Sequence, residues 1–147
     1  MVVLINEFVN ENEFLSNFYP SPIKDEKGIE YPTVEHYFQA AKTLDESERK
    51  AIAAAPTPGK AKQMGRNVNL RRDWEVIKEY IMYDALRLKF ADPVLAEKLL
   101  ATGDQDLEEG NWWHDNTWGN CKCDKCKDIL GKNLLGQLLM RVRSEIQ

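Results

Sequence analysis

The sequence predicts an α+β fold: a single compact, mostly helical domain over residues 1–147 with a small β-sheet. Two observations support this prediction. Most of the central chain has helical periodicity between good capping residues, whereas runs typical of strands are short and lie towards the two ends. The elements follow the order β, loop, several helices, short β, helix. This order is typical of α+β domains and not of alternating βαβ units.

The strand signals are few. "VVLINEF", at residues 2–8, is rich in β-branched and aromatic residues and predicts a strand. Residues 15–32 mix Pro, Ser, Asn and Gly, which predicts a loop with a short hairpin around Lys27 and Gly28. Residues 103–128 combine short alternating pieces with many turn formers. We expect one or two short strands and a long irregular loop there.

Capping residues mark the starts of the helices. Thr33, Thr57 and Asp92 are good N-caps, Pro58 suits a first helical position, and Asn133 is the expected N-cap of the last helix. The predicted helices span residues 34–43, 47–55, 57–66, 74–90, 94–102 and 133–146.

The helix over 74–90 has the clearest periodicity. Its apolar residues recur at spacings of three and four, which predicts one buried stripe. The stripe would contain Trp74, Ile77, Ile81, Ala85 and Leu88.

Composition restricts the expected partners. The formal net charge of −4 argues against bulk electrostatic binding to nucleic acid, so small molecules or one modified base are expected. The N-terminus lacks the pattern of a secretory signal, and no apolar stretch reaches the length of a membrane span. We therefore expect a cytoplasmic protein with no membrane partner and no obligatory protein partner.

The segment "YPTVEHYFQAAK", residues 31–42, gathers groups capable of acid–base or nucleophilic chemistry. Glu35, Gln39 and Lys42 fall on one side of the helix, with Glu35 and Lys42 about 10 Å apart along its axis. The periodicity alone fits a solvated face with a weak Glu–Lys relation. It also fits a cleft in which a desolvated lysine attacks an electrophilic carbon beside a carboxylate. Its neighbour His36 is interpreted as a packed residue, with a catalytic base as the alternative.

Three further segments offer substrate contacts. Asn17, Phe18 and Tyr19 are either turn and core residues, or an amide and two aromatic rings that hold a planar base. Among the basic residues of 60–72, most of which are expected to be solvated, Arg66 is the preferred phosphate ligand because it follows a glycine.

The segment "WWHDNTWGN", residues 112–120, places Asp115 among tryptophans. Such a carboxylate could act as an acid or bind ribose hydroxyls, or it could lie at the edge of an aromatic core. Gly119 and Asn133 are assigned to the same wall of the expected substrate site as Asp115. The nearby cysteines, Cys121, Cys123 and Cys126, are too few and too close together for a disulfide framework.

A zinc site at these cysteines with His114 as fourth ligand is one interpretation of the spacing. The spacing lacks a second paired knuckle, so free loop thiols are favoured. We expect no metal and no cofactor.

The chain resembles the NADAR (YbiA-like) family through an ordered series of motifs. In order along the chain these are "FLSNFYP", "YPTVEHYFQAAK", "GRNVNLRRDWE", "KF", "LLATGD", "DNTWG" and "GKNLLGQLLMRVR". The resemblance covers about residues 14–143. "CKCDKC" is the least general part of the match, and no family role is assigned to it. It implies an α+β N-glycosidase acting on ribosides. The substrates that it implies are phosphoribosylamino-pyrimidine intermediates of riboflavin biosynthesis, or ADP-ribosylated guanine in nucleic acid.

The resemblance also assigns roles to residues. It places Glu35 and Lys42 at the catalytic centre, with a Lys42 Schiff base as the suggested mechanism and Glu35 or Asp115 moving the proton. The residues expected to contact the substrate are Asn17, Phe18, Tyr19, His36, Gln39, Arg66, Trp74, Trp118, Gly119 and Asn133. A non-catalytic module that binds ADP-ribose or NAD is the alternative, against which an intact Glu35 and Lys42 speak.

Overall fold

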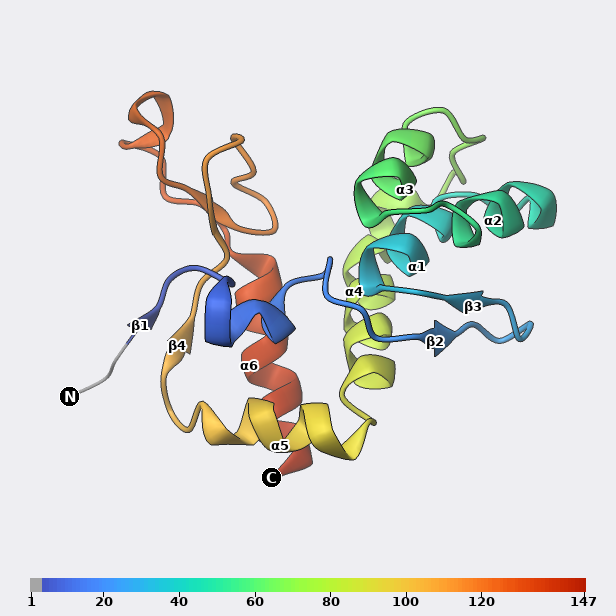
Figure 1. Cartoon of the computed structure of the whole chain (residues 1–147). Helices are drawn as coiled ribbons and strands as arrows, with labels where there is room; N and C mark the ends of the chain where they lie inside the picture. Colours follow the sequence, from blue (N-terminus) through green and yellow to red (C-terminus); the bar gives the residue numbers. More distant parts are fainter. Residues whose placement is uncertain (1–3) are drawn as a thin grey trace. The chain divides into compact units, whose positions relative to one another are not determined.

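The computed structural model of the chain describes residues 4–147 (Figure 1). These residues form two compact units. The central unit is Asn17–Lys89, and the terminal unit combines residues 4–16 with Phe90–Gln147. The predicted mostly helical α+β fold is confirmed. The single domain over residues 1–147 stays a prediction.

The central unit contains one hairpin followed by helices. Strands β2 (Ile23–Lys24) and β3 (Glu30–Tyr31) pair antiparallel, as predicted, and Gly28 in their connection has φ +81°. A positive φ is strained for residues with a Cβ, which explains the glycine. The helices are α1 (Val34–Ala40), α2 (Glu46–Ala53), α3 (Pro58–Gly65) and α4 (Trp74–Lys89).

The predicted caps of the central unit are confirmed. The Thr33 hydroxyl accepts the His36 N–H at 3.1 Å, and the Thr57 hydroxyl accepts the Lys60 N–H at 3.0 Å. Each bond satisfies a backbone donor that the first helical turn leaves unpaired. Helix α1 ends at Ala40, three residues before the predicted end.

The buried stripe of α4 differs from the prediction. Leu88 is exposed, whereas Lys89 is buried. Ile77 and Ile81 are only half-buried. The residues that α4 buries are Trp74, Met82, Ala85, Leu86 and Lys89. Periodicity selects the buried stripe by apolar residue type and therefore ends it at Leu88. In the structure the last buried residue of α4 is the next one, Lys89.

Helix α1 is the centre of the unit. It contacts α2, α3, α4 and β3, and every residue of Val34–Ala40 is buried. The interpretation of its polar side as a solvated face is therefore wrong. Its neighbours enclose both the apolar and the polar side of the helix.

The terminal unit is built around two parallel strand pairs, each strand only two residues long. Strand β1 (Leu4–Ile5) pairs with β4 (Asp106–Leu107), and β5 (Gly110–Asn111) pairs with β6 (Asn120–Cys121). The predicted strand over residues 2–8 is reduced to β1, and its residues 2 and 3 lie outside the described part. Short 3₁₀ turns cover Asn10–Leu15 (η1) and Asp124–Cys126 (η2).

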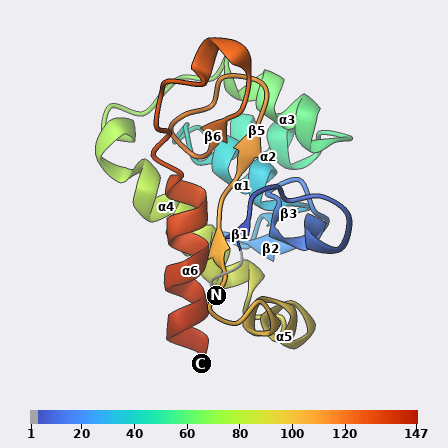
Figure 2. The same ribbon diagram turned by 90° about the vertical axis from the view of Figure 1, so that its left-hand side faces the viewer.

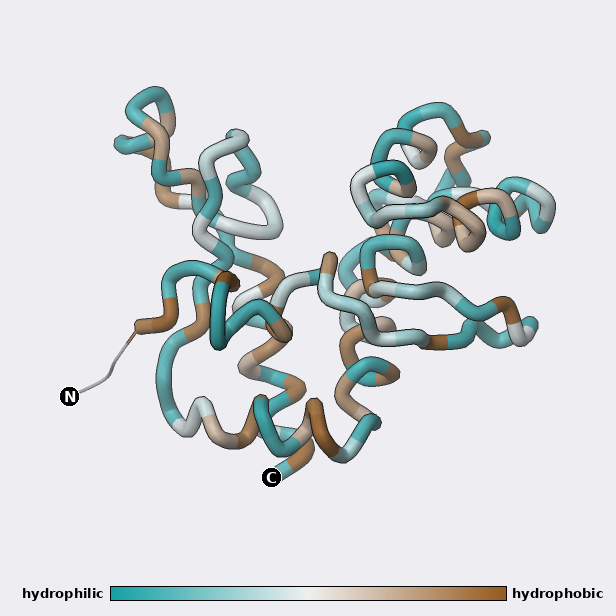
Figure 3. Tube along the Cα trace, viewed as in Figure 1, coloured by the Kyte–Doolittle hydropathy of each residue, from teal (hydrophilic) through white to brown (hydrophobic). Residues whose placement is uncertain are grey.

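Two helices complete the terminal unit. Helix α5 (Pro93–Ala101) begins at the predicted cap, where the Asp92 carboxylate accepts the Val94 N–H at 2.9 Å. Helix α6 (Leu134–Ile146) packs on α5 and β4, and hydrophobic and hydrophilic residues alternate along it (Figure 3). The loop region that carries β5 and β6 lies at the N-terminal end of α6 (Figure 2).

Asn133 precedes α6 but does not cap it with its side chain. Its backbone is left-handed, at φ +50°, a conformation that asparagine tolerates better than most residues. The side chain instead accepts the Glu109 N–H at 2.9 Å and donates to the Leu107 carbonyl at 2.8 Å. Asn133 therefore ties the start of α6 to the end of β4.

Among residues 4–147, no helix is both long enough and apolar enough to cross a membrane.

Candidate active site

A buried carboxylate and a buried amide form the centre of the candidate site. Glu35 and Gln39 are separated by one turn of α1, and the Gln39 amide N–H donates to Glu35 Oε1 at 2.8 Å. Their side chains are buried, with residue exposures of 7% and 4%. The bond fixes which end of the amide faces Glu35. Gln39 Oε1 is buried and accepts no hydrogen bond from the described residues.

Gly65, the last residue of α3, leaves the room that Gln39 occupies. A Cβ built on Gly65 would lie 2.0 Å from Gln39 Oε1 and 2.9 Å from its Cδ. No side chain fits at that separation without displacing the amide. The glycine thus allows α3 to pack against the polar side of α1.

Lys42 lies just after α1 and is half-buried. Burial lowers the pKa of its amine below the usual 10.5, and the positive charges of Lys62 and Arg66 lower it further. The Glu35 carboxylate acts in the opposite direction. A lowered pKa increases the share of neutral amine, the form that can act as a nucleophile.

The same charge interactions show which charged groups influence Lys42. The charges of one carboxylate, Glu35, and two cations, Lys62 and Arg66, act on its amine. Arg66 is exposed and stands at the C-terminal end of α3, directly after Gly65. Its guanidinium can bind a phosphate by charge and hydrogen bonds.

Trp74 forms an aromatic surface beside the lysine. The Lys42 amine lies 6.0 Å from the centroid of the Trp74 ring, which also packs against Phe38 at 5.0 Å between centroids. Trp74 is 6% exposed, so its contacts within the core account for most of its surface.

The segment after residue 16 reaches the same helix. The Glu35 N–H donates to the Asn17 carbonyl at 3.1 Å, and the Asn17 side-chain N–H lies 3.6 Å from Met82 Sδ. Asn17 Oδ1 is buried and accepts no hydrogen bond from the described residues. It is therefore a second buried acceptor next to the start of α1. Phe18 is 44% exposed.

A second lysine, Lys89, was not assigned from the sequence. It is 1% exposed, and burial lowers the pKa of its amine from 10.5 to about 7. The amine lies 5.8 Å from the centroid of the Tyr19 ring, a substrate-site candidate. Lys89 belongs to the short family motif "KF", but the helical periodicity of residues 74–90 does not predict that it is buried.

His36 has both ring nitrogens engaged. Nδ1 lies 2.8 Å from the Thr33 hydroxyl, and Nε2 lies 3.1 Å from the Ala55 carbonyl oxygen. A carbonyl can only accept, so Nε2 carries the proton and Nδ1 accepts from the hydroxyl. These bonds and its 1% exposure favour the interpretation as a packed residue.

The remaining sequence-predicted residues lie in the terminal unit. The Asp115 carboxylate accepts the N–H groups of Thr117 and Trp118 at 3.1 and 2.9 Å, so it holds a turn. Gly119 permits close approach of the backbone, because a Cβ there would lie 2.2 Å from the Glu109 carbonyl oxygen. Together with the two bonds of Asn133, these contacts explain the residue types by local structure.

A hollow of about 470 Å³ in the central unit is lined by Thr43, Leu44, Asp45, Asn69, Leu70, Arg71, Arg72 and Asp73. Neither Glu35 nor Lys42 lines it. Three of the charged residues that line it have local partners, because Arg71 pairs with Asp73 and the Asp45 carboxylate accepts the Ser47 and Glu48 N–H groups at the start of α2.

The fold and the site thus define a small α+β protein with a buried carboxylate and a buried amide on its central helix and a half-buried lysine just after it. The NADAR domain pattern matches residues 6–147, and the chain belongs to this family. The chain is similar to the N-glycosidase YbiA of Shigella flexneri serotype 5b, with 41% identity over 148 residues, 97% of this chain and 88% of that protein.

Two further similarities extend this result. The NMR structure of the Escherichia coli protein YbiA superimposes with a TM-score of 0.83 at 40% identity, over 99% of this chain and 86% of that one. The riboflavin biosynthesis protein PYRR of Zea mays is 38% identical over 89% of this chain, which corresponds to 23% of that longer protein. The likeness to the solved structure confirms the predicted fold.

Proposed function

We propose that the chain is an N-glycosidase that hydrolyses the bond between a base and the ribose of a phosphorylated riboside, with Lys42 as nucleophile and Glu35 as proton carrier. The observation that carries the proposal is the arrangement at α1: the buried Glu35 carboxylate is hydrogen-bonded to Gln39, and the half-buried Lys42 amine lies 6.0 Å from the Trp74 ring centroid. Burial lowers the pKa of the Lys42 amine. The name of the Shigella flexneri relative, N-glycosidase, supports the reaction class.

The proposed reaction needs only these groups and water. The neutral Lys42 amine attacks C1′ of the ribose, and Glu35 takes the proton that the amine loses. Glu35 passes this proton to the base as the C1′–N bond breaks. The C1′–O4′ bond of the resulting glycosylamine then breaks, and O4′ takes the proton that remains on Nζ. This leaves a Schiff base between C1′ and Nζ, which water hydrolyses to the free sugar and the lysine. The net change is riboside plus water to sugar plus base.

The surroundings of Lys42 suit a phosphorylated substrate. Lys62 and Arg66 supply positive charge in a protein whose net charge is −4. Two substrate classes fit: phosphoribosylamino-pyrimidines, favoured by the name of the Zea mays relative, and ADP-ribosylated guanine in nucleic acid.

Borohydride trapping tests the mechanism, because it reduces a Schiff base to a stable adduct. Enzyme and each substrate are mixed with borohydride, and the modified lysine is located by mass spectrometry. We expect a sugar adduct on Lys42 and loss of turnover in Lys42→Ala. Lys50→Ala, which alters an exposed lysine of α2, serves as control. An adduct on Lys89, or no adduct together with turnover by Lys42→Ala, would refute Lys42 as nucleophile.

Chromatography for base release compares the two substrate classes side by side. The alternative function is a module that binds ADP-ribose or NAD through the same site without catalysis. Isothermal titration with ADP-ribose, run beside the release assay, separates the two. Tight binding without release of base from either substrate would overturn the enzyme proposal in favour of the binder.

A further inference from the structure

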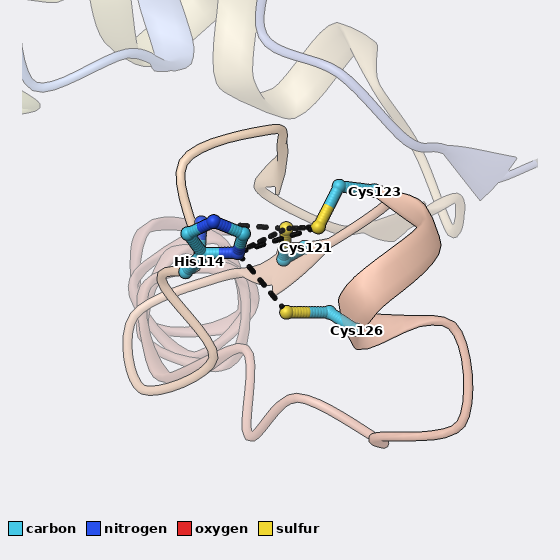
Figure 4. Close-up of side chains that lie close together, drawn as sticks. All are labelled: His114, Cys121, Cys123 and Cys126. Carbon is cyan, nitrogen blue, oxygen red and sulfur yellow. Dashed lines mark hydrogen bonds between the residues drawn. The ribbon is translucent and has the colours of Figure 1, made fainter.

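The loop region of the terminal unit brings one histidine and three cysteines together (Figure 4). Their metal-ligating atoms, His114 Nδ1 and the Sγ atoms of Cys121, Cys123 and Cys126, all lie within 4.8 Å of one another. Nδ1 is 3.3 Å from the sulfurs of Cys123 and Cys126 and 3.9 Å from that of Cys121. Cys121 and Cys123 are separated by 3.3 Å between sulfurs.

These separations match those of a tetrahedral zinc centre. With Zn–S near ~2.3 Å and Zn–N near ~2.0 Å, tetrahedral angles place sulfurs about 3.8 Å apart and nitrogen about 3.5 Å from sulfur. The observed contacts scatter around these values. We propose that His114, Cys121, Cys123 and Cys126 bind a structural zinc ion in the terminal unit, as a closed Cys₃His site.

Each ligand is positioned by a different piece of local structure. Cys121 ends strand β6, and Cys126 ends the 3₁₀ turn η2, where its N–H donates to the Cys123 carbonyl at 3.1 Å. His114 has a left-handed backbone, φ +68°, which is uncommon for a residue with a Cβ. Its own N–H donates to Cys121 Sγ at 3.3 Å, a contact that stabilises a thiolate.

The ligand set favours zinc over the other uses of cysteine. Cys₃His is a common structural zinc set, whereas iron–sulfur clusters are usually held by four cysteines. An odd number of thiols leaves one unpaired if the others form a disulfide. With four protein ligands the ion would have no open position for substrate. Three thiolates and Zn²⁺ carry one net negative charge, and Lys122, Lys125 and Lys127 lie between and beside the ligands.

The ion would stabilise a segment that has little regular structure. Between β5 and α6 the chain forms only β6 and η2, and it is otherwise held by side-chain bonds. The Asn111 side-chain N–H donates to the Asp115 carbonyl at 2.8 Å, and Asn116 Oδ1 accepts the Cys121 N–H at 2.9 Å. A metal that joins residues 114 and 126 closes the loop around these contacts and restricts the unfolded chain.

Metal analysis of the untagged full chain tests the proposal. We expect about one zinc per chain in protein purified without chelator, and at least a tenfold lower content in Cys126→Ser. Lys125→Ser, which changes a neighbouring residue that is not a ligand, should keep the zinc. Cobalt added to the reduced, metal-free chain should give the thiolate charge-transfer and d–d bands of a tetrahedral site.

A second variant keeps the test decisive if Cys126→Ser does not fold. His114→Cys supplies a fourth sulfur, so metal content should persist while the cobalt spectrum shifts. Wild-type protein without zinc that also fails to bind cobalt would overturn the proposal. So would bound iron with a cluster spectrum, a disulfide in freshly purified protein, or an unchanged spectrum in His114→Cys. Neither readout involves turnover, so the result is independent of the N-glycosidase proposal.

Discussion

Replacing Lys89 by methionine should change how the stability of the protein depends on pH. Lys89 is 1% exposed, and burial lowers the pKa of its amine from 10.5 to about 7. In the unfolded chain the amine regains its ordinary pKa. Between pH 7 and pH 10.5 the unfolded state therefore binds more protons than the folded state, and the free energy of unfolding rises with pH. Below pH 7 both states are protonated and the dependence ends.

The size of the effect follows from single-site linkage. A difference of one bound proton changes the free energy of unfolding by about 1.36 kcal/mol per pH unit. From pH 7 to pH 9 the folded amine goes from half protonated to nearly neutral, while the unfolded amine stays charged. The Lys89 contribution should therefore rise by about 2 kcal/mol over this interval. Lys89→Met removes this rise, because methionine does not titrate.

Urea unfolding at pH 7, 8 and 9 measures the effect. The wild-type free energy of unfolding should rise by about 2 kcal/mol more than that of Lys89→Met over this range. Any packing change in the variant adds an offset that does not depend on pH, so the slopes remain comparable. Lys50→Met, at an exposed lysine paired with Glu46, should keep the wild-type slope. Parallel slopes for wild type and Lys89→Met would refute the burial of a titrating amine.

Two other substitutions test the packing around the site and the loop. Gly65→Ala should displace the Gln39 amide and lower kcat/KM by about 10²-fold, with the fold retained. The control is Gly59→Ala, whose Cβ would meet nothing closer than 3.9 Å and which should keep wild-type kinetics. Equal kinetics for the two variants would contradict the contact. Asn133→Ala should lower the free energy of unfolding by about 2 kcal/mol, because it leaves the Glu109 N–H and the Leu107 carbonyl without their partner. A thermal melt unchanged from wild type would show that these bonds contribute nothing.

Local signals in the sequence were enough to place most helices. Thr33, Thr57 and Asp92 cap helices as predicted, because a cap depends on a side chain and a backbone N–H two or three residues away. The hairpin at Gly28 was found for the same reason. The ordered family motifs, and not the periodicity, point to Glu35 and Lys42 as catalytic candidates.

What the sequence could not decide depends on contacts between distant segments. The polar side of α1 is buried because α3 approaches it at Gly65, and no local pattern contains that contact. Lys89 is buried for a similar reason, since helical periodicity ranks positions by residue type and treats a lysine as solvated. Asparagine is a residue type that often caps helices, yet the Asn133 side chain forms hydrogen bonds to the backbone of Glu109 and Leu107, 24 and 26 positions earlier.

The cysteine cluster separates the two kinds of information most clearly. The spacing of Cys121, Cys123 and Cys126 is visible in the sequence, and His114 is a candidate fourth ligand, but the spacing lacks a second paired knuckle and therefore favours free loop thiols. Only the folded loop, with His114 in a left-handed conformation, brings an imidazole nitrogen to within 3.3 Å of two of the sulfurs. Sequence thus determined which residues are capable of chemistry, and tertiary packing decided which of them meet. The reason is that helix caps and turns form between near neighbours, whereas burial and ligand geometry form only when the chain folds back on itself.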